Sequence, residues 1–306
     1  MLSNEFFQKF PTFTVIVNCR NSERFLSQCL ESIQHQSYTN FEVIVWDNMS
    51  VDNTFQIASA YSKSDGRFKV FCGLSPLKLG EARNMAIRES QGRYIAFLDS
   101  DDLWHPNFLS DHIKVLDSYE QQIFGIGNVI EIDAAFRLTK DSTVDPVILN
   151  PVQPKKIFRK LLKGNTVYFS SLVIPKDFFD HNFGFKPNYV QAEDYELLLR
   201  ASRKMKCYKT GLAYYRIHEG NATNSQLDEL FVESTEILKS YNKHFWGWVT
   251  FKLTAARYFL YLDSPTYKSR LKKLKNQKIR VADLLIGAII LSLVTIKSEI
   301  FGKRAR

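Results

Sequence analysis

Three aspartates crowd one short segment of the chain, Asp99, Asp101 and Asp102, directly after an apolar run. Carboxylates this close repel one another and raise each other's pKa unless a cation offsets their charge. Mg²⁺ and Mn²⁺ bind such oxygen ligands and share them with phosphate oxygens. As an alternative, Asp101 or Asp102 caps the helix expected after Pro106. A cap needs a single aspartate, so the cluster favours a metal and phosphate site.

A fourth aspartate, Asp47, ends the apolar run that begins at Phe41. At the tip of a strand, its carboxylate can accept a hydrogen bond from the N–H of a nucleobase. Taken alone, an Asx turn that starts a helix is the simpler explanation.

Two cations and a glycine stand together at Lys78, Gly80 and Arg83. The glycine permits a tight turn, and both cations lie where the first turn of a helix can face an anion. A structural or solvated arginine fits the same pattern equally well.

Two acidic residues, Glu193 and Asp194, precede an apolar helical run. A carboxylate placed beside a sugar donor could take the proton of an acceptor hydroxyl. The same residues also make an ordinary helix N-terminus.

Arg216 and His218 are two residues apart on an expected strand, so both point to one face. That face could contact a diphosphate or a metal. A lone histidine is more often structural, so this pair needs support from the other motifs.

The elements that must position these residues alternate between two hydrophobic periods over the first 120 residues. Expected strands cover 13–17, 41–46, 67–72 and 93–98, and expected helices cover 23–36, 51–62 and 80–90, the first capped by Ser22. This alternation predicts an α/β fold with a mostly parallel sheet and helices on both faces. Loops after the strands meet at the carboxyl edge of such a sheet, where Asn18, Asp47 and Asp99 would converge.

The second half of the chain is less regular. Expected strands there are 123–132, 167–174 and 213–217, expected helices are 155–162 and 194–204, and the pattern is helical from about residue 226.

Composition is that of a globular protein, with 45% apolar and 24% charged residues in 306. The four cysteines lack the spacing of a zinc site or a disulfide framework and indicate a reducing compartment: Cys19, Cys29, Cys72 and Cys207. The first residues have no basic segment followed by a long apolar run, so no secretory signal is expected.

The net charge of +9 arises in the last part of the chain, where residues 265–306 hold eleven basic and two acidic residues. Within them, 281–296 is nearly all apolar, but sixteen helical residues reach about 24 Å, short of a hydrocarbon core. Asp283 adds a cost to insertion. We therefore expect a helix lying on an anionic membrane surface. A helix packed on the catalytic domain or on a dimer partner is the alternative.

The ordered set of motifs resembles the family 2 glycosyltransferases, with their Rossmann-like GT-A fold. The similar segments are FTVIVNCRNSERFLSQCLESIQHQSYTNFEVIVWDNMSVDNT, GEARNMAIRESQGRYIAFLDSDD, AEDYELLLR and YRIH. They cover 12–120 densely and 165–220 thinly. One segment alone is weak evidence, whereas four in this order are specific.

The resemblance implies roles for the matching residues. Asp47 would hold the base, and Asp99 and Asp101 would form the family's Asp-x-Asp motif at the ribose and the metal-bound diphosphate. Asp194, beside Glu193, would be the general base. The implied donor ligands are Asn18, Asp47, Lys78, Arg83, Asp99 and Arg216, and the implied metal ligands are Asp99, Asp101 and His218. Two departures leave base and sugar preference open: Asn18-Cys19-Arg20 replaces a Pro-Thr-Tyr-like loop, and Asn48 replaces a second aspartate.

The implied activity is hexosyl transfer with inversion, dependent on Mg²⁺ or Mn²⁺. The donor would be a nucleoside diphosphate sugar, by default UDP-linked, and the acceptor a saccharide or lipid-linked saccharide of a bacterial-type surface polysaccharide pathway. A catalytic domain would cover 1–222, with a donor half at 1–120 and an acceptor half at 121–222, followed by a helical region at 223–306. The location would be cytoplasmic, at the inner face of the plasma membrane, with no nucleic-acid partner.

Three other functions are weaker. A sugar nucleotidyltransferase should have a glycine-rich phosphate loop after the first strand, and residues 18–24 contain no glycine. A protein that only binds nucleic acid or membrane leaves Asp99–Asp102 unexplained, because carboxylates repel phosphate. A degenerate transferase that binds donor without turnover is a further alternative, and the intact Asp99, Asp101 and Asp194 count mildly against it.

Overall fold

The computed structural model describes residues 10–119, 123–139, 148–182, 184–221 and 227–241. The predictions for the basic segment 265–306 and for the apolar helix 281–296 lie outside these residues. Within the described part of the chain, no helix is long and apolar enough to cross a membrane.

The chain divides into two compact units. The first comprises the described residues up to 157 together with 166–188 and 200–219, and it holds the whole sheet. The second comprises 158–165, 189–199 and the described residues from 220 onward.

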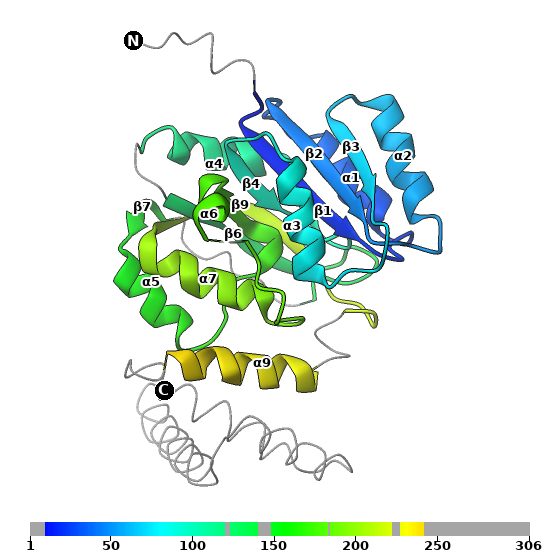
Figure 1. Ribbon diagram of the computed structural model, residues 1–306. Coiled ribbons are helices and arrows are strands. Elements are labelled where there is room, and N and C mark those ends of the chain that lie inside the picture. Colours follow the sequence, from blue (N-terminus) through cyan, green and yellow to red (C-terminus); the bar gives the residue numbers. More distant parts are fainter. Residues whose placement is uncertain (1–9, 120–122, 140–147, 183, 222–226, 242–306) are drawn as a thin grey trace, which may run out of the picture. The chain divides into compact units, whose positions relative to one another are not determined.

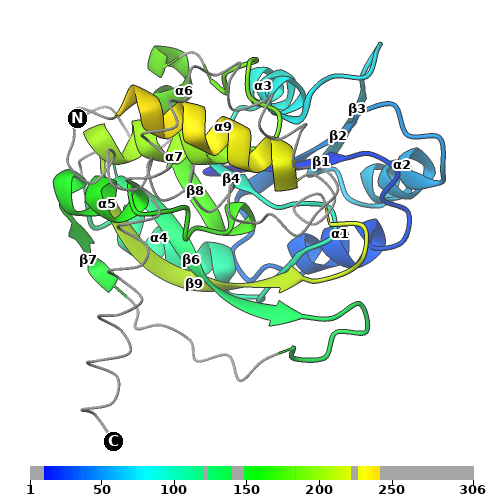
Figure 2. The same ribbon diagram turned by 90° about the horizontal axis from the view of Figure 1, so that it is seen from below.

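The first half of the sheet is parallel, as the alternation of strands and helices predicts. Strand β1 (Phe13–Cys19) pairs with β2 (Phe41–Asp47) on one side and β4 (Tyr94–Phe97) on the other, and β3 (Phe68–Cys72) pairs with β2. The intervening helices are α1 (Leu26–Gln34), α2 (Thr54–Ser64) and α3 (Leu79–Glu89). Figures 1 and 2 show α1 and α2 on one face of these strands and α3 on the other.

The second half of the sheet mixes directions. Strand β8 (Leu172–Pro175) runs antiparallel to β4 and to β6 (Ile123–Ile132), while β9 (Lys206–Arg216) runs parallel to β6. Short strands β5 (Leu103–Trp104) and β7 (Ile148–Val152) pair antiparallel with β9. The strand order is β3-β2-β1-β4-β8-β6-β9-β5. The remaining helices are α4 (Phe108–Leu116), α5 (Pro154–Leu161), α6 (Asp177–Asn182), α7 (Glu193–Lys204) and α9 (Leu227–Ser240), with a 3₁₀ turn η2 at Phe169–Ser171.

The side chains of β1 point alternately to the two faces of the sheet, which places some of them in the core and Asn18 on the other face. Val15, Val17 and Cys19 are buried in the core that includes Leu30 of α1. Because successive side chains of a strand point to opposite faces, the residues between them face the α3 side. Asn18 therefore reaches the carboxyl end of β1 on the face that carries α3.

Three helix starts differ from the sequence expectations. Helix α1 begins at Leu26 without a side-chain cap, and the Ser22 hydroxyl instead bonds to the hydroxyl of Ser100. Helix α2 begins at Thr54 rather than at residue 51. Helix α4 begins at Phe108, after Asn107, so neither Asp101 nor Asp102 caps it. The capping alternative for the aspartate cluster is therefore wrong.

Candidate functional site

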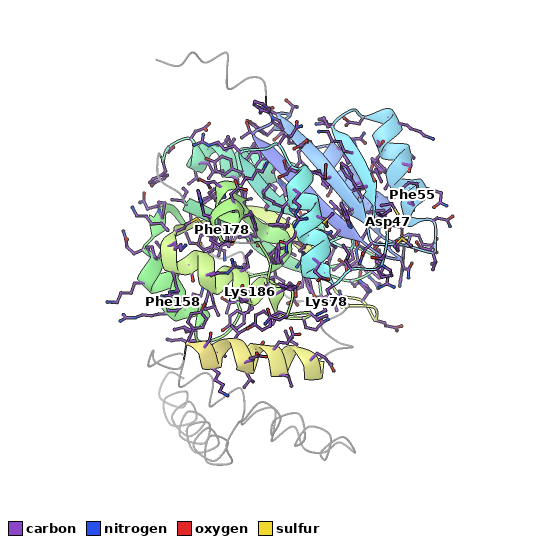
Figure 3. The ribbon with its side chains drawn as sticks, viewed as in Figure 1. Asp47, Phe55, Lys78, Phe158, Phe178 and Lys186 are labelled. Carbon is purple, nitrogen blue, oxygen red and sulfur yellow. The ribbon has the colours of Figure 1, made fainter. Side chains whose placement is uncertain are left out.

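Strands β1, β2 and β3 end at the same level of the sheet. Cys19, Asp47 and Cys72 are register partners across β1, β2 and β3, so the loops that follow them lie along one edge of the sheet. Asp47 occupies the end of β2 at that edge (Figure 3). This is the convergence of loops that the sequence predicts for a parallel sheet.

The Asp47 side chain organises the loop after β2. It is 1% exposed, and its Oδ1 accepts the backbone N–H and the hydroxyl of Ser50. The turn foreseen as the simpler explanation is therefore present. A carboxylate has about four lone-pair sites, so this turn does not exhaust its capacity to accept from a ligand N–H.

An amide links two loops of this edge. The Nδ2 of Asn48 donates to the carbonyl of Leu77 over 2.7 Å, and its Oδ1 accepts the Leu77 N–H over 2.9 Å. The next residue, Met49, has φ 63°, a backbone conformation that costs a side chain of this kind about 1 kcal/mol. The Asn48 amide thus holds a strained loop against the segment that leads into α3.

Asn18 carries polar atoms without partners. Both atoms of its side-chain amide are shielded from solvent and have no hydrogen-bond partner among the described residues, and the same holds for Nε1 of Trp46, its register neighbour on β2. An unsatisfied buried polar atom costs about 1–3 kcal/mol. A ligand that brings a donor and acceptors to this place would remove that cost.

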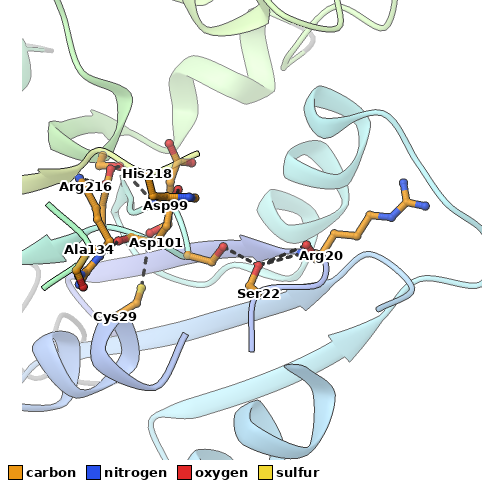
Figure 4. Close-up of polar contacts among 11 residues, drawn as sticks. Arg20, Ser22, Cys29, Asp99, Asp101, Ala134, Arg216 and His218 are labelled. Carbon is orange, nitrogen blue, oxygen red and sulfur yellow. Dashed lines mark hydrogen bonds and ion pairs between the residues drawn. The ribbon is translucent and has the colours of Figure 1, made fainter. Parts of the chain in front are cut away.

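The aspartate loop begins just after β4. Asp99 Oδ1 accepts from the Arg83 guanidinium over 2.9 Å, and Asp101 Oδ2 lies 2.9 Å from Nε2 of His218 (Figure 4). The side chains of Asp99 and Asp101 are 39% and 28% exposed, so both reach solvent. Arg20 points away from this pair in Figure 4.

Arg83 is 3% exposed and fixes Asp99 from within the protein. Its guanidinium lies 4.0 Å from the ring centroid of Phe169 and 5.5 Å from that of Phe185. Aromatic faces attract a cation. These contacts hold the arginine in one place, and the arginine in turn orients the carboxylate of Asp99.

Asp102 and Arg216 lie beneath the loop. Asp102 is 1% exposed, accepts from the Ser170 hydroxyl, and accepts the backbone N–H of Arg216 over 2.8 Å. Arg216 is fully buried, and its guanidinium donates to the carbonyls of Asp101 and Ala134 and to Gln28 (Figure 4). The contacts of Arg216 hold the backbone of the aspartate loop against the buried part of the protein.

The electrostatics of the loop fit a cation. Burial raises the pKa of Asp101, the charge of Asp99 raises it further, and the hydrogen bond from His218 opposes both. Burial raises the pKa of Asp102 well above its ordinary value, and both neighbouring aspartates add to this. In the described part of the chain, no group of three His, Cys, Asp or Glu side chains is arranged so that it could hold a metal ion. Carboxylate oxygens suit Mn²⁺ and Mg²⁺, so an ion at this loop would bind Asp99 or Asp101 and take most of its shell from phosphate oxygens and water.

Lys78 stands at the start of α3. Its backbone N–H donates to Glu81, which closes the first turn, and its Nζ donates to the carbonyl of Pro187 over 3.0 Å. The ammonium group is thus held near the segment after α6.

The predicted acid pair lies in the second unit. Helix α7 begins at Glu193, which is 3% exposed, while Asp194 is partly exposed. Asp194 Oδ2 lies 3.5 Å from Nδ2 of Asn165, and its Oδ1 accepts the N–H of Tyr195. Of the two acids, Asp194 is therefore the one that a solvent molecule or hydroxyl can approach.

A residue that the sequence did not single out anchors this pair. The carboxylate of Glu233, on α9, accepts the N–H groups of Val190, Gln191 and Ala192 at 2.8 to 3.0 Å. These donors are the backbone just before α7. No sequence signal marks Glu233, because a glutamate on an amphipathic helix normally faces water.

Comparison with known proteins gives consistent results. Residues 14–183 match the model of glycosyl transferase family 2. The chain is similar to a UDP-Glc:alpha-D-GlcNAc-diphosphoundecaprenol beta-1,3-glucosyltransferase of Escherichia coli, with 29% identity over 232 residues, 74% of this chain and 85% of the relative.

Solved structures share the fold. A crystal structure of Staphylococcus aureus TarS 1-349 in complex with UDP-GlcNAc superposes with a TM-score of 0.64 at 20% identity, covering 87% of this chain and 78% of that one. A mannosyltransferase from Pyrobaculum calidifontis in complex with GDP-Man and Mn²⁺ gives a TM-score of 0.57 at 13% identity, covering 96% of this chain and 88% of that one.

Proposed function

The chain belongs to glycosyl transferase family 2 and has the GT-A fold, and from this premise we propose that it transfers a sugar from a UDP-sugar to a saccharide or lipid-linked saccharide, with inversion. The observation that carries the proposal is the paired carboxylates of Asp99 and Asp101. Arg83 contacts the carboxylate of Asp99, and His218 contacts that of Asp101. Both follow β4, which pairs with β1, and Asn18 and Asp47 lie at or next to the ends of β1 and β2.

In this proposal, polar groups of the edge bind the nucleoside. Asp47 accepts the N–H of the base, and the amide of Asn18, which has no partner among the described residues, bonds to a base or ribose group. Uracil presents one N–H between two carbonyls, which suits a carboxylate beside amide donors. Thymine presents the same group, so this argument favours a pyrimidine, and UDP, which the Escherichia coli relative uses as its sugar carrier, is the first choice of nucleotide.

Asp99, Asp101 and His218 would hold Mg²⁺ or Mn²⁺ together with the diphosphate. When bound, the ion stabilises the charge that builds on the leaving nucleoside diphosphate. Arg83 keeps the Asp99 carboxylate oriented, and the Arg216 contacts keep the loop in place. Lys78 adds a positive charge near the start of α3.

Asp194 would act as the general base, with Glu193 buried beside it. Its carboxylate takes the proton of an acceptor hydroxyl while the hydroxyl oxygen attacks the anomeric carbon. The bond from that carbon to the diphosphate oxygen breaks, and the nucleoside diphosphate leaves with the electron pair. One displacement inverts the anomeric configuration.

The acceptor assignment follows the curated relative, whose name specifies a sugar on a diphosphate-linked lipid. An acceptor of that kind sits at a membrane. A catalytic region over 1–222 with a peripheral, basic region at 265–306 on the inner face of the plasma membrane belongs to the same proposal.

Calorimetry with UDP, GDP and thymidine diphosphate, with and without Mn²⁺, tests the donor site. We expect metal-dependent binding of UDP by the wild type, and Asp101→Ala should weaken it by about tenfold to a hundredfold. A folded wild type that binds none of these nucleotides would overturn the donor assignment. Binding that is equally tight without metal would overturn the metal assignment alone.

A further inference from the structure

A second cluster of the first unit lies outside the donor assignment. Glu131 of β6 and Tyr215 of β9 are register partners, so their side chains share one face of the sheet. The Tyr168 ring packs against the Tyr215 ring with centroids 4.9 Å apart and an interplanar angle of 51°. The Tyr168 hydroxyl donates to Glu131 over 2.7 Å. Two aromatic rings and a carboxylate thus form one surface.

Solvent reaches the aromatic part of this surface, whereas Oε2 of Glu131 is shielded from it. Tyr168 is 36% exposed, although it is a large aromatic residue, and Glu131 and Tyr215 are only partly buried. Burial and the bond to Glu131 raise the pKa of Tyr168 to about 12, so its hydroxyl stays protonated at neutral pH. The carboxylate carries the charge of the cluster.

The cluster is joined to the aspartate loop through three consecutive residues. Phe169, next to Tyr168, packs under the Arg83 guanidinium that holds Asp99. The Ser170 hydroxyl accepts the backbone N–H of Asp99 over 3.1 Å. Tyr168 therefore directly precedes the 3₁₀ turn whose Phe169 and Ser170 contact Arg83 and Asp99.

We propose that Tyr168, Tyr215 and Glu131 form a platform that binds a neutral pyranose of the acceptor saccharide. This assignment rests on the proposed function, because it names the second substrate of the same reaction. A pyranose has an apolar C–H face, which packs on the negative face of an aromatic ring, and equatorial hydroxyls, one of which can donate to the Glu131 Oε1 that also accepts from Tyr168. The Glu131 charge also repels a uronic acid or a phosphorylated sugar.

Strand β9 supplies a matched control. Tyr214 adjoins Tyr215 but points to the opposite face, where its ring packs on Phe136 with centroids 5.3 Å apart. Replacing either tyrosine by alanine removes the same atoms from the same strand. Only the change at Tyr215 removes part of the platform.

Saturation-transfer NMR on the UDP-loaded full chain tests the proposal, with methyl β-glucoside, methyl N-acetyl-α-glucosaminide and methyl β-glucuronide as probes. We expect the two neutral glycosides to receive saturation on the C–H protons of one ring face, and the glucuronide to receive little. Tyr215→Ala should weaken neutral-glycoside binding by about tenfold, whereas Tyr214→Ala should change it by less than about twofold.

Two further variants separate binding from folding. Tyr168→Phe keeps the ring and should retain neutral-glycoside binding, while Glu131→Gln should bring glucuronide binding close to that of the glucoside. Equal glycoside binding by Tyr215→Ala and the wild type would overturn the platform, as would a UDP-bound wild type that saturates no glycoside. Glycoside binding by a protein that binds no UDP would keep the platform and reject the donor assignment.

Discussion

The side chain of Asn48 and the backbone of Leu77 form a two-way hydrogen bond, with the amide donating over 2.7 Å and accepting over 2.9 Å. A carboxylate can accept but cannot donate when ionised. The departure from the aspartate frequent in similar sequences at this position therefore has a structural reason here.

Asn48→Asp should destabilise the protein by about 1–3 kcal/mol, because the new carboxylate faces the Leu77 carbonyl and leaves it without a donor. Urea unfolding at pH 7.5 measures the change. Asn40→Asp is the control, since Asn40 is exposed and its amide donates only to the hydroxyl of Thr12, which can donate in return. Equal losses in the two variants would refute the role of the two-way bond.

His218→Gln should reduce the affinity for UDP in the presence of Mn²⁺ by about tenfold, and should have a much smaller effect without metal. The physical reason is that Nε2 lies 2.9 Å from Asp101, so the imidazole either ligates the ion or orients the carboxylate that does. Calorimetry measures both affinities. His35→Gln on the exposed end of α1 is the matched control, and a metal-independent loss would contradict the assignment of His218.

Glu233→Ala should lower the turnover rate and destabilise the second unit by about 1–3 kcal/mol, because three backbone N–H groups before α7 lose their acceptor. Amide hydrogen exchange at Val190 to Ala192 measures the local effect, and initial rates measure the catalytic one. Glu236→Ala, one turn along on the exposed side of α9, should leave both unchanged. Unaltered exchange in Glu233→Ala would show that the contact does not order the segment.

The sequence predicts those parts of the fold that depend on the residue pattern of one short segment. The run 41–46 is a buried strand because all of its residues except Glu42 are apolar. The crowding of Asp99 and Asp101 is a local feature of the same kind, and it predicts a cation site by charge alone. The antiparallel insertion of β8 depends on pairings distant in sequence, and strand β5 has only two residues, too few for a pattern.

The same distinction holds for the candidate site. Residue type and spacing select Arg83 and Arg216, but they do not reveal that Arg83 rests on Phe169 or that Arg216 is wholly buried. Those facts depend on which chain segments meet in the fold. The role of Glu233 could not be predicted from the sequence either, because the three N–H groups that it accepts lie about forty residues earlier in the chain.

The pH dependence of stability should contain a contribution from His112. This residue is fully buried, its Nδ1 lies 2.9 Å from the Tyr208 hydroxyl, and burial lowers its pKa from 6.5 to about 3. An imidazole whose pKa is lowered by folding stays neutral in the native state at a pH where the unfolded chain takes up a proton. The free energy of unfolding should therefore be unaffected by His112 above pH 6.5 and should fall by about 1.4 kcal/mol per pH unit below it.

His112→Gln removes this titration while keeping a polar side chain opposite Tyr208. The variant should be less stable than the wild type at pH 7.5, because the imidazole packs between Phe108 and Tyr208. The difference should narrow as the pH falls to 4.5, since only the wild type has to keep a neutral imidazole against protonation. Urea unfolding at five pH values gives both curves. Parallel curves would show that protonation of His112 does not drive the acid destabilisation.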